Sequence, residues 1–127
     1  MKNILIIDLE MDFSDLIIAM LKSYYTVEVD ILSDPRLLHE TLQNRAYQGV
    51  IVDLLSGGFT LIEQILQDPA YRQIPIIALS AKLLSGRERK FLLQRNIHFL
   101  PKPFESGRLV SQFHQLFHQA QDSRLHL

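Results

Sequence analysis

Polar side chains follow directly after apolar runs at several places in this sequence. Asp8 follows the run 4–7, Asp53 follows 49–52, Ser80 follows 76–79 and Lys102 follows 99–101. Such runs are typical of buried strands in a parallel sheet, and open α/β sheets keep their chemistry at the carboxyl ends of the strands. Two carboxylates, a hydroxyl and an ammonium group are therefore expected to converge on one edge of a sheet. The sequence predicts a polar site there.

Five successive strand–helix units are predicted to position these groups. The expected strands are 4–7, 27–31, 50–52, 76–79 and 99–100. The segments between them carry apolar residues three or four positions apart, which is typical of amphipathic helices. In the second strand, apolar and charged residues alternate, which indicates a place near the edge of the sheet. Consecutive parallel strands need right-handed crossovers, so the pattern predicts helices on both faces of the sheet.

Helix boundaries can be predicted from short polar signals. Asp12 is expected to cap the first helix, and Asp34-Pro35 combines a cap with a proline at the first helical position of the second. The third helix is expected to stop near Asp68-Pro69. Asn96 follows the fourth helix, and asparagine can adopt the left-handed conformation that often ends a helix.

Composition limits the classes of protein to be considered. The chain has 127 residues, of which 47% are hydrophobic, and this is enough for one compact domain. We expect that domain over 1–121 and a tail over 122–127. A formal net charge of −1 gives no bulk attraction to nucleic acid or to an anionic membrane. No cysteine is available for disulfides or thiolate zinc sites, and no signal-peptide or membrane-span pattern is present, so a cytoplasmic protein is expected.

Four motifs in order resemble those of response-regulator receiver domains, the phosphoacceptor modules of two-component signalling, and the resemblance covers nearly the whole chain. The motifs lie at 4–10, 52–58, 74–81 and 99–104. They match an acidic first-strand ending, a phosphoacceptor strand and loop, a Ser/Thr-Ala ending and a Lys-Pro-Phe ending. The resemblance implies an α/β fold: a single doubly wound, five-stranded parallel sheet of the flavodoxin-like (βα)5 type with strand order 2-1-3-4-5.

The resemblance also implies a role for each matched residue. Asp53 would be the phosphoacceptor, supplied by a sensor histidine kinase or a phosphotransfer protein. Lys102 would pair with the phosphoryl oxygens, and Ser80 would move toward the modified aspartate. Phe99 would rotate inward behind Ser80 as the switch aromatic. The signal would then reach a downstream protein target or a homodimer through the fourth helix, fifth strand and fifth helix, with no enzymatic turnover and no direct contact with nucleic acid or membrane.

Mg²⁺ is the cofactor that the resemblance implies. Asp8 and Asp53 match the metal-site positions, and Leu55 matches the residue that lends its backbone carbonyl. Leu9 departs from the family because it stands where a second acidic residue is usual, which favours weak Mg²⁺ binding. Glu10 follows it, and metal ligand and solvated charge remain alternatives for this residue. Gly57 replaces the usual loop proline, which favours a looser loop.

Two functional hypotheses follow from this sequence. The first is a phosphorylated receiver, and the alternative is a pseudo-receiver, a phosphorylation-independent protein-interaction module whose metal site Leu9 has weakened. An enzyme that binds a nucleotide is disfavoured because no phosphate-binding glycine motif follows a strand. A Ser-His-Asp hydrolase is disfavoured because the chain has no Gly-x-Ser-x-Gly elbow.

Overall fold

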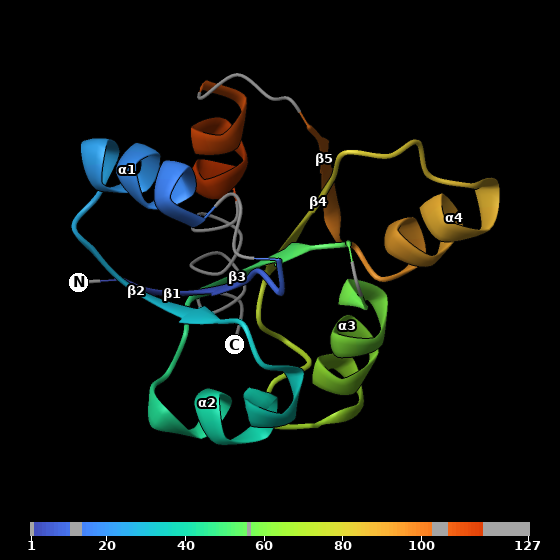
Figure 1. The fold of residues 1–127 in the computed structure, drawn as a ribbon, viewed down its shortest axis with the longest axis horizontal. Coiled ribbons are helices and arrows are strands. Elements are labelled where there is room, and N and C mark those ends of the chain that lie inside the picture. Colours follow the sequence, from blue (N-terminus) through green and yellow to red (C-terminus); the bar gives the residue numbers. More distant parts are fainter. Residues whose placement is uncertain (1, 11–13, 56, 103–106, 116–127) are drawn as a thin grey trace, which may run out of the picture.

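The computed structural model describes residues 2–10, 14–55, 57–102 and 107–115. Its elements, drawn in Figure 1, are β1 (Lys2–Ile7), α1 (Ser14–Tyr24), β2 (Val27–Leu32), the 3-10 helix η1 (Pro35–Leu37), α2 (Leu38–Asn44), β3 (Gly49–Asp53), α3 (Gly58–Gln67), β4 (Ile76–Ser80), α4 (Gly86–Gln94) and β5 (His98–Pro101). Residues 107–115 are also helical.

The strands form one parallel sheet in the order β2-β1-β3-β4-β5. This confirms both the predicted strand order and the place of the second strand at an edge. The order reverses at β1, which has β2 on one side and β3 on the other. Such a switch point leaves a crevice between the carboxyl ends of β1 and β3, because the connections that follow these two strands run in opposite directions. Asp8 and Asp53 stand at those two ends.

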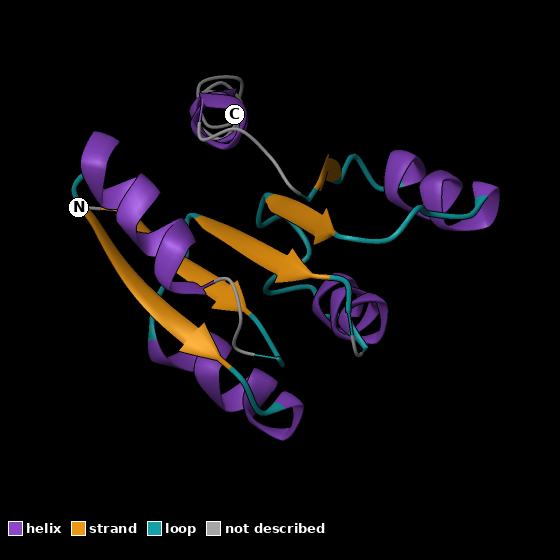
Figure 2. Ribbon diagram, turned by 45° about the horizontal axis from the view of Figure 1, so that its top comes forward, coloured by secondary structure: helices purple, strands orange, loops and turns teal. Residues whose placement is uncertain are grey.

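Helices cover both faces of the sheet, as Figure 2 shows. In β1, Ile4 and Ile6 pack with α1 and the helix at 107–115, whereas Leu5 and Ile7 pack with α2, α3 and α4. The division follows from the pleat of a strand, which sends successive side chains to opposite faces. The near-continuous apolar runs are therefore explained by burial on both sides.

Most of the predicted helix boundaries can be compared with the structure. Asp34 is the cap that its sequence predicts, and its Oδ1 accepts a hydrogen bond from the Arg36 N–H at 3.0 Å. It caps a 3-10 turn, after which α2 continues. Asp68 ends α3, and Asn96 is left-handed with φ of 56°. Asp12 and the predicted boundary between 121 and 122 lie outside the described residues.

Within the described part of the chain, no helix has the length and apolar character needed to cross a membrane.

Candidate functional site

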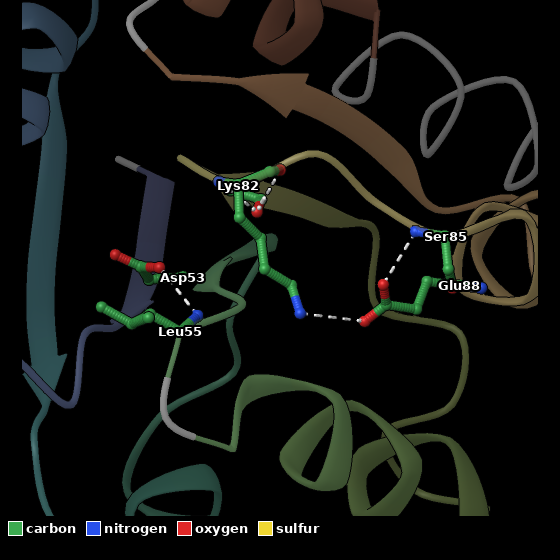
Figure 3. A network of polar contacts seen from close by, with 6 residues as sticks. Asp53, Leu55, Lys82, Ser85 and Glu88 are labelled. Carbon is green, nitrogen blue, oxygen red and sulfur yellow. Dashed lines mark hydrogen bonds and ion pairs between the residues drawn. The ribbon is translucent and has the colours of Figure 1, made fainter.

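Asp53 forms a buried ion pair with Lys102 at the carboxyl edge of the sheet. The Lys102 Nζ lies 2.5 Å from Asp53 Oδ2, and the two residues are only 9% and 4% exposed. The other carboxylate oxygen, Oδ1, accepts a hydrogen bond from the Leu55 N–H at 3.0 Å, which Figure 3 shows. Burying a charge without a partner is costly, so the ammonium and the N–H group stabilise the charged carboxylate.

Backbone hydrogen bonds beyond the strand ends place these groups together. The Leu54 N–H donates to the Leu79 carbonyl, and the Lys102 N–H donates to the Ser80 carbonyl, each at 2.8 Å. They prolong the ladders of β3 with β4 and of β4 with β5. Asp53, Ser80 and Lys102 are therefore held on three neighbouring strands, as the sequence predicted for one edge of the sheet.

Asp8 supplies a second carboxylate from the end of β1. It is 1% exposed and, together with Asp53 and Ile17 of α1, lines a gap that is too small to hold a water molecule. Its Oδ2 accepts a hydrogen bond from the Ser14 N–H at 3.1 Å, so Asp8 stabilises the first turn of α1 as a capping residue would. The contact with Ser14 was not predicted from the sequence, because a capping residue six positions before its partner leaves no local sequence pattern.

Among the described residues at this edge, the buried acidic side chains outnumber the buried basic ones. Asp8 and Asp53 carry two negative charges and Lys102 one positive charge, all within a site of low exposure. An added cation with oxygen ligands would reduce the repulsion between the carboxylates. Mg²⁺ fits this donor set, since it is commonly anchored by one or two carboxylates and several waters.

The structure also describes Leu9 and Glu10, the two residues that follow Asp8. Leu9 is partly buried and packs against the apolar core, and Glu10 is exposed. Among the residues that the structure describes, no group of three or more His, Asp or Glu side chains is placed to hold a metal ion. Among the described residues, the buried carboxylates at this edge are those of Asp8 and Asp53. Ligation by Glu10 and by the Leu55 carbonyl stays a prediction.

The two predicted switch residues lie close to the site. The Ser80 hydroxyl makes two hydrogen bonds, both with the backbone of Lys82: it donates to the carbonyl at 3.0 Å and accepts from the N–H at 3.2 Å. Its side chain is thus held by the loop after β4. Phe99 pairs with Ala78 across β5 and β4 and is partly buried against the core. The predicted movements of both side chains stay predictions.

Two glycines shape the loop after Asp53. Gly57 has φ of +100° at the start of α3, a left-handed conformation that proline, with φ fixed near about −65°, cannot adopt. Gly58 approaches the site closely, because a Cβ on it would lie 2.3 Å from the Asp53 carbonyl oxygen. The glycine at 58 is therefore required by the backbone that presents the carboxylate.

No protein-family model matches the sequence, and no curated protein matches it either. Solved structures do match, including NtrX from Brucella abortus in complex with ADP, with a TM-score of 0.83 and 22% identity over 98% of this chain. The chain spans only 28% of the length of that NtrX chain.

Two further matches are similar in length to this chain. The chemotaxis protein CheY4 of Vibrio cholerae has a TM-score of 0.78 and 19% identity, covering 91% of this chain and 98% of its own. The signal receiver domain of a signal transduction histidine kinase from Syntrophus aciditrophicus has a TM-score of 0.80 and 21% identity, covering 94% of this chain and 92% of its own. The chain therefore has the CheY-like receiver fold.

Proposed function

We propose that this chain is a phosphoacceptor receiver domain, modified on Asp53 by a histidine kinase or a phosphotransfer protein. The observation that carries the proposal is the buried pair of Asp53 and Lys102 beside Asp8, at the switch point of a receiver fold. A carboxylate and an ammonium group at this position suit a reaction that brings a phosphoryl group to a carboxylate oxygen.

The proposed transfer moves one phosphoryl group between two nucleophiles. An Asp53 carboxylate oxygen attacks the phosphorus of a phosphohistidine, and the P–N bond breaks with its electron pair left on the imidazole. The product is an acyl phosphate on Asp53. Lys102 is already within contact of this carboxylate and stabilises the phosphoryl oxygens as a positive point charge. A Mg²⁺ held by Asp8 and Asp53 would supply further charge neutralisation.

The proposed output is a change in protein contacts. Ser80 lies one strand away from Asp53, and Phe99 lies one strand further, on β5. A modified Asp53 therefore has a short route through β4 to the surface formed by α4, β5 and the helix at 107–115. We expect a downstream protein or a second copy of the chain to bind that surface.

The pseudo-receiver is the second candidate, and one observation favours it. Leu9 packs against the core at the position where the family usually has a second acidic residue, so the buried carboxylates described at this edge are those of Asp8 and Asp53. In that case, the receiver fold would bind a partner without being phosphorylated.

Intact-mass measurement separates the two candidates. After incubation with acetyl phosphate and Mg²⁺, the proposed receiver gains one phosphoryl group, and Asp53→Asn gains none because an amide is not nucleophilic. Asp15→Asn, which changes an exposed acid at the start of α1, serves as the control and should behave as the unmodified sequence does. No gain in a folded protein would favour the pseudo-receiver, and uptake by Asp53→Asn would exclude Asp53 as the acceptor.

A further inference from the structure

The Ser80 hydroxyl uses its only hydrogen on the Lys82 carbonyl. A hydroxyl can donate one hydrogen bond, so Ser80 cannot donate to a group on Asp53 while this contact persists. Its oxygen also accepts the Lys82 N–H. Any movement of Ser80 toward a modified Asp53 must therefore release the backbone of Lys82.

The side chain of Lys82 extends from the same residue to the start of α4, as Figure 3 shows. Its Nζ lies 3.7 Å from Glu88 Oε2. Glu88 also forms a capping box with Ser85: its Oε1 accepts the Ser85 N–H at 2.9 Å, and its own N–H donates to the Ser85 hydroxyl at 3.1 Å. The two oxygens of one carboxylate thus bind the cap of α4 and the loop that holds Ser80.

Apolar contacts hold α4 on either side of its first turn, and Leu84, just before the cap, is buried in the core. Leu92 is the one buried side chain of this helix, and it lies beyond the first turn. The Phe91 ring packs edge-on against Phe59 at 5.7 Å between centroids, also beyond the first turn. The backbone hydrogen bond from Ser85 lowers the pKa of the Glu88 carboxyl, and the charge of Lys82 adds to this effect, so Glu88 is an anion at neutral pH.

We propose that Lys82 is a positioning residue that couples the orientation of the Ser80 hydroxyl to the first turn of α4. Its backbone retains the hydroxyl, and its ammonium anchors that backbone to Glu88. This coupling rests on the proposed function, because phosphorylation of Asp53 is the event that would draw Ser80 away from Lys82. By linkage, a contact that holds the unmodified arrangement opposes phosphoryl binding, and loosening the contact favours it.

The first test needs no phosphoryl group. We expect the backbone amide hydrogen of residue 82 to exchange with solvent faster in Lys82→Gln than in the unmodified sequence. The increase should be at most about fivefold, because an exposed ion pair contributes little free energy. Lys82→Arg should restore the original rate. Lys90→Gln is the matched control, because Lys90 is an exposed lysine of α4 with no ion pair among the described residues. At about 1 M salt, the difference should vanish because the exposed charges are screened.

The second test uses beryllium fluoride with Mg²⁺ as a stable phosphoryl mimic. Lys82→Gln should bind it more tightly by the same factor, whereas Lys90→Gln should bind it as the unmodified sequence does. Equal amide exchange in Lys82→Gln and Lys90→Gln would overturn the positioning role. Faster exchange with unchanged mimic affinity would overturn the coupling. If the protein takes up neither a phosphoryl group nor the mimic, the proposed function is wrong. The amide exchange rates alone would then decide whether Lys82 positions Ser80.

Discussion

The ammonium of Lys102 lies 2.5 Å from the carboxylate of Asp53, although the two residues are 49 positions apart in the sequence. The pair is nearly inaccessible to solvent, with side-chain exposures of 4% and 5%. A buried pair of this kind contributes little net stability when intact, yet breaking it by removing one partner is costly because the other charge stays buried. Under the proposed function, the residues that react are therefore also the ones whose removal costs stability.

We expect Lys102→Met to lower the free energy of unfolding by about 3 kcal/mol, because the change leaves Asp8 and Asp53 buried without the ammonium. Adding Asp53→Asn to that variant should recover part of the loss, since one of the two carboxylate charges is then gone. Chemical denaturation of both single variants and the double variant measures the coupling. If the effects of the two substitutions on the free energy of unfolding simply add, Lys102 and Asp53 are not energetically coupled.

We expect Gly58→Ala to destabilise the fold by about 2 kcal/mol, because its Cβ would meet the Asp53 carbonyl oxygen at 2.3 Å and backbone cannot move aside cheaply. The same variant should slow phosphoryl uptake, since the displaced backbone carries Asp53. Gly86→Ala is the control: a Cβ there meets nothing within 4 Å, so it should be neutral or stabilise α4 by about 0.5 kcal/mol. Thermal unfolding and intact mass are the readouts. Equal behaviour of the two alanine variants would contradict the predicted close contact.

We expect Leu9→Asp to tighten Mg²⁺ binding, because it adds a carboxylate beside Asp8 and Asp53. It should also lower stability without metal, because Leu9 packs against the core and a third negative charge is added. Leu9→Asn loses the same packing without adding a charge, so the difference between these variants isolates the carboxylate. Metal titration followed by NMR shifts provides the affinities. If Leu9→Asp and Leu9→Asn bind Mg²⁺ equally, the residue at position 9 does not reach the metal.

A pH prediction concerns Tyr47, in the loop between α2 and β3, which contacts Asp30 on the edge strand β2. Its hydroxyl donates to Asp30 Oδ2 at 2.6 Å, and burial, followed by this hydrogen bond, raises the pKa of Tyr47 above its usual 10.0. The folded state therefore keeps a proton that the unfolded state releases. Stability from this group should be complete below pH 10.0 and should fall as the pH rises above it.

Tyr47→Phe should remove that alkaline loss. Burial also raises the pKa of Tyr25, which adds a loss of the same sign, so the comparison is made as a difference between Tyr47→Phe and the unmodified sequence. Unfolding free energies measured on either side of pH 10 supply the difference curve. Parallel curves would mean that Tyr47 titrates alike in the folded and unfolded states.

Strand identity and the edge on which the site lies were predictable from the sequence. Four apolar runs end in Asp8, Asp53, Ser80 and Lys102, and parallel strands bring such endings to one edge because all of them point the same way. The strand order itself came from the resemblance to receiver domains and is confirmed by the sheet.

The partners of those side chains were decided by tertiary structure. Asp8 binds the Ser14 N–H, Ser80 binds the backbone of Lys82, and Gly58 approaches the Asp53 carbonyl oxygen. A periodic pattern fixes which face a residue occupies, but the choice of hydrogen-bond partner depends on which donors and acceptors come within about 3 Å once strands and loops are assembled. The sequence thus determined which groups meet at the edge of the sheet, and only the packed loops decided which of them touch.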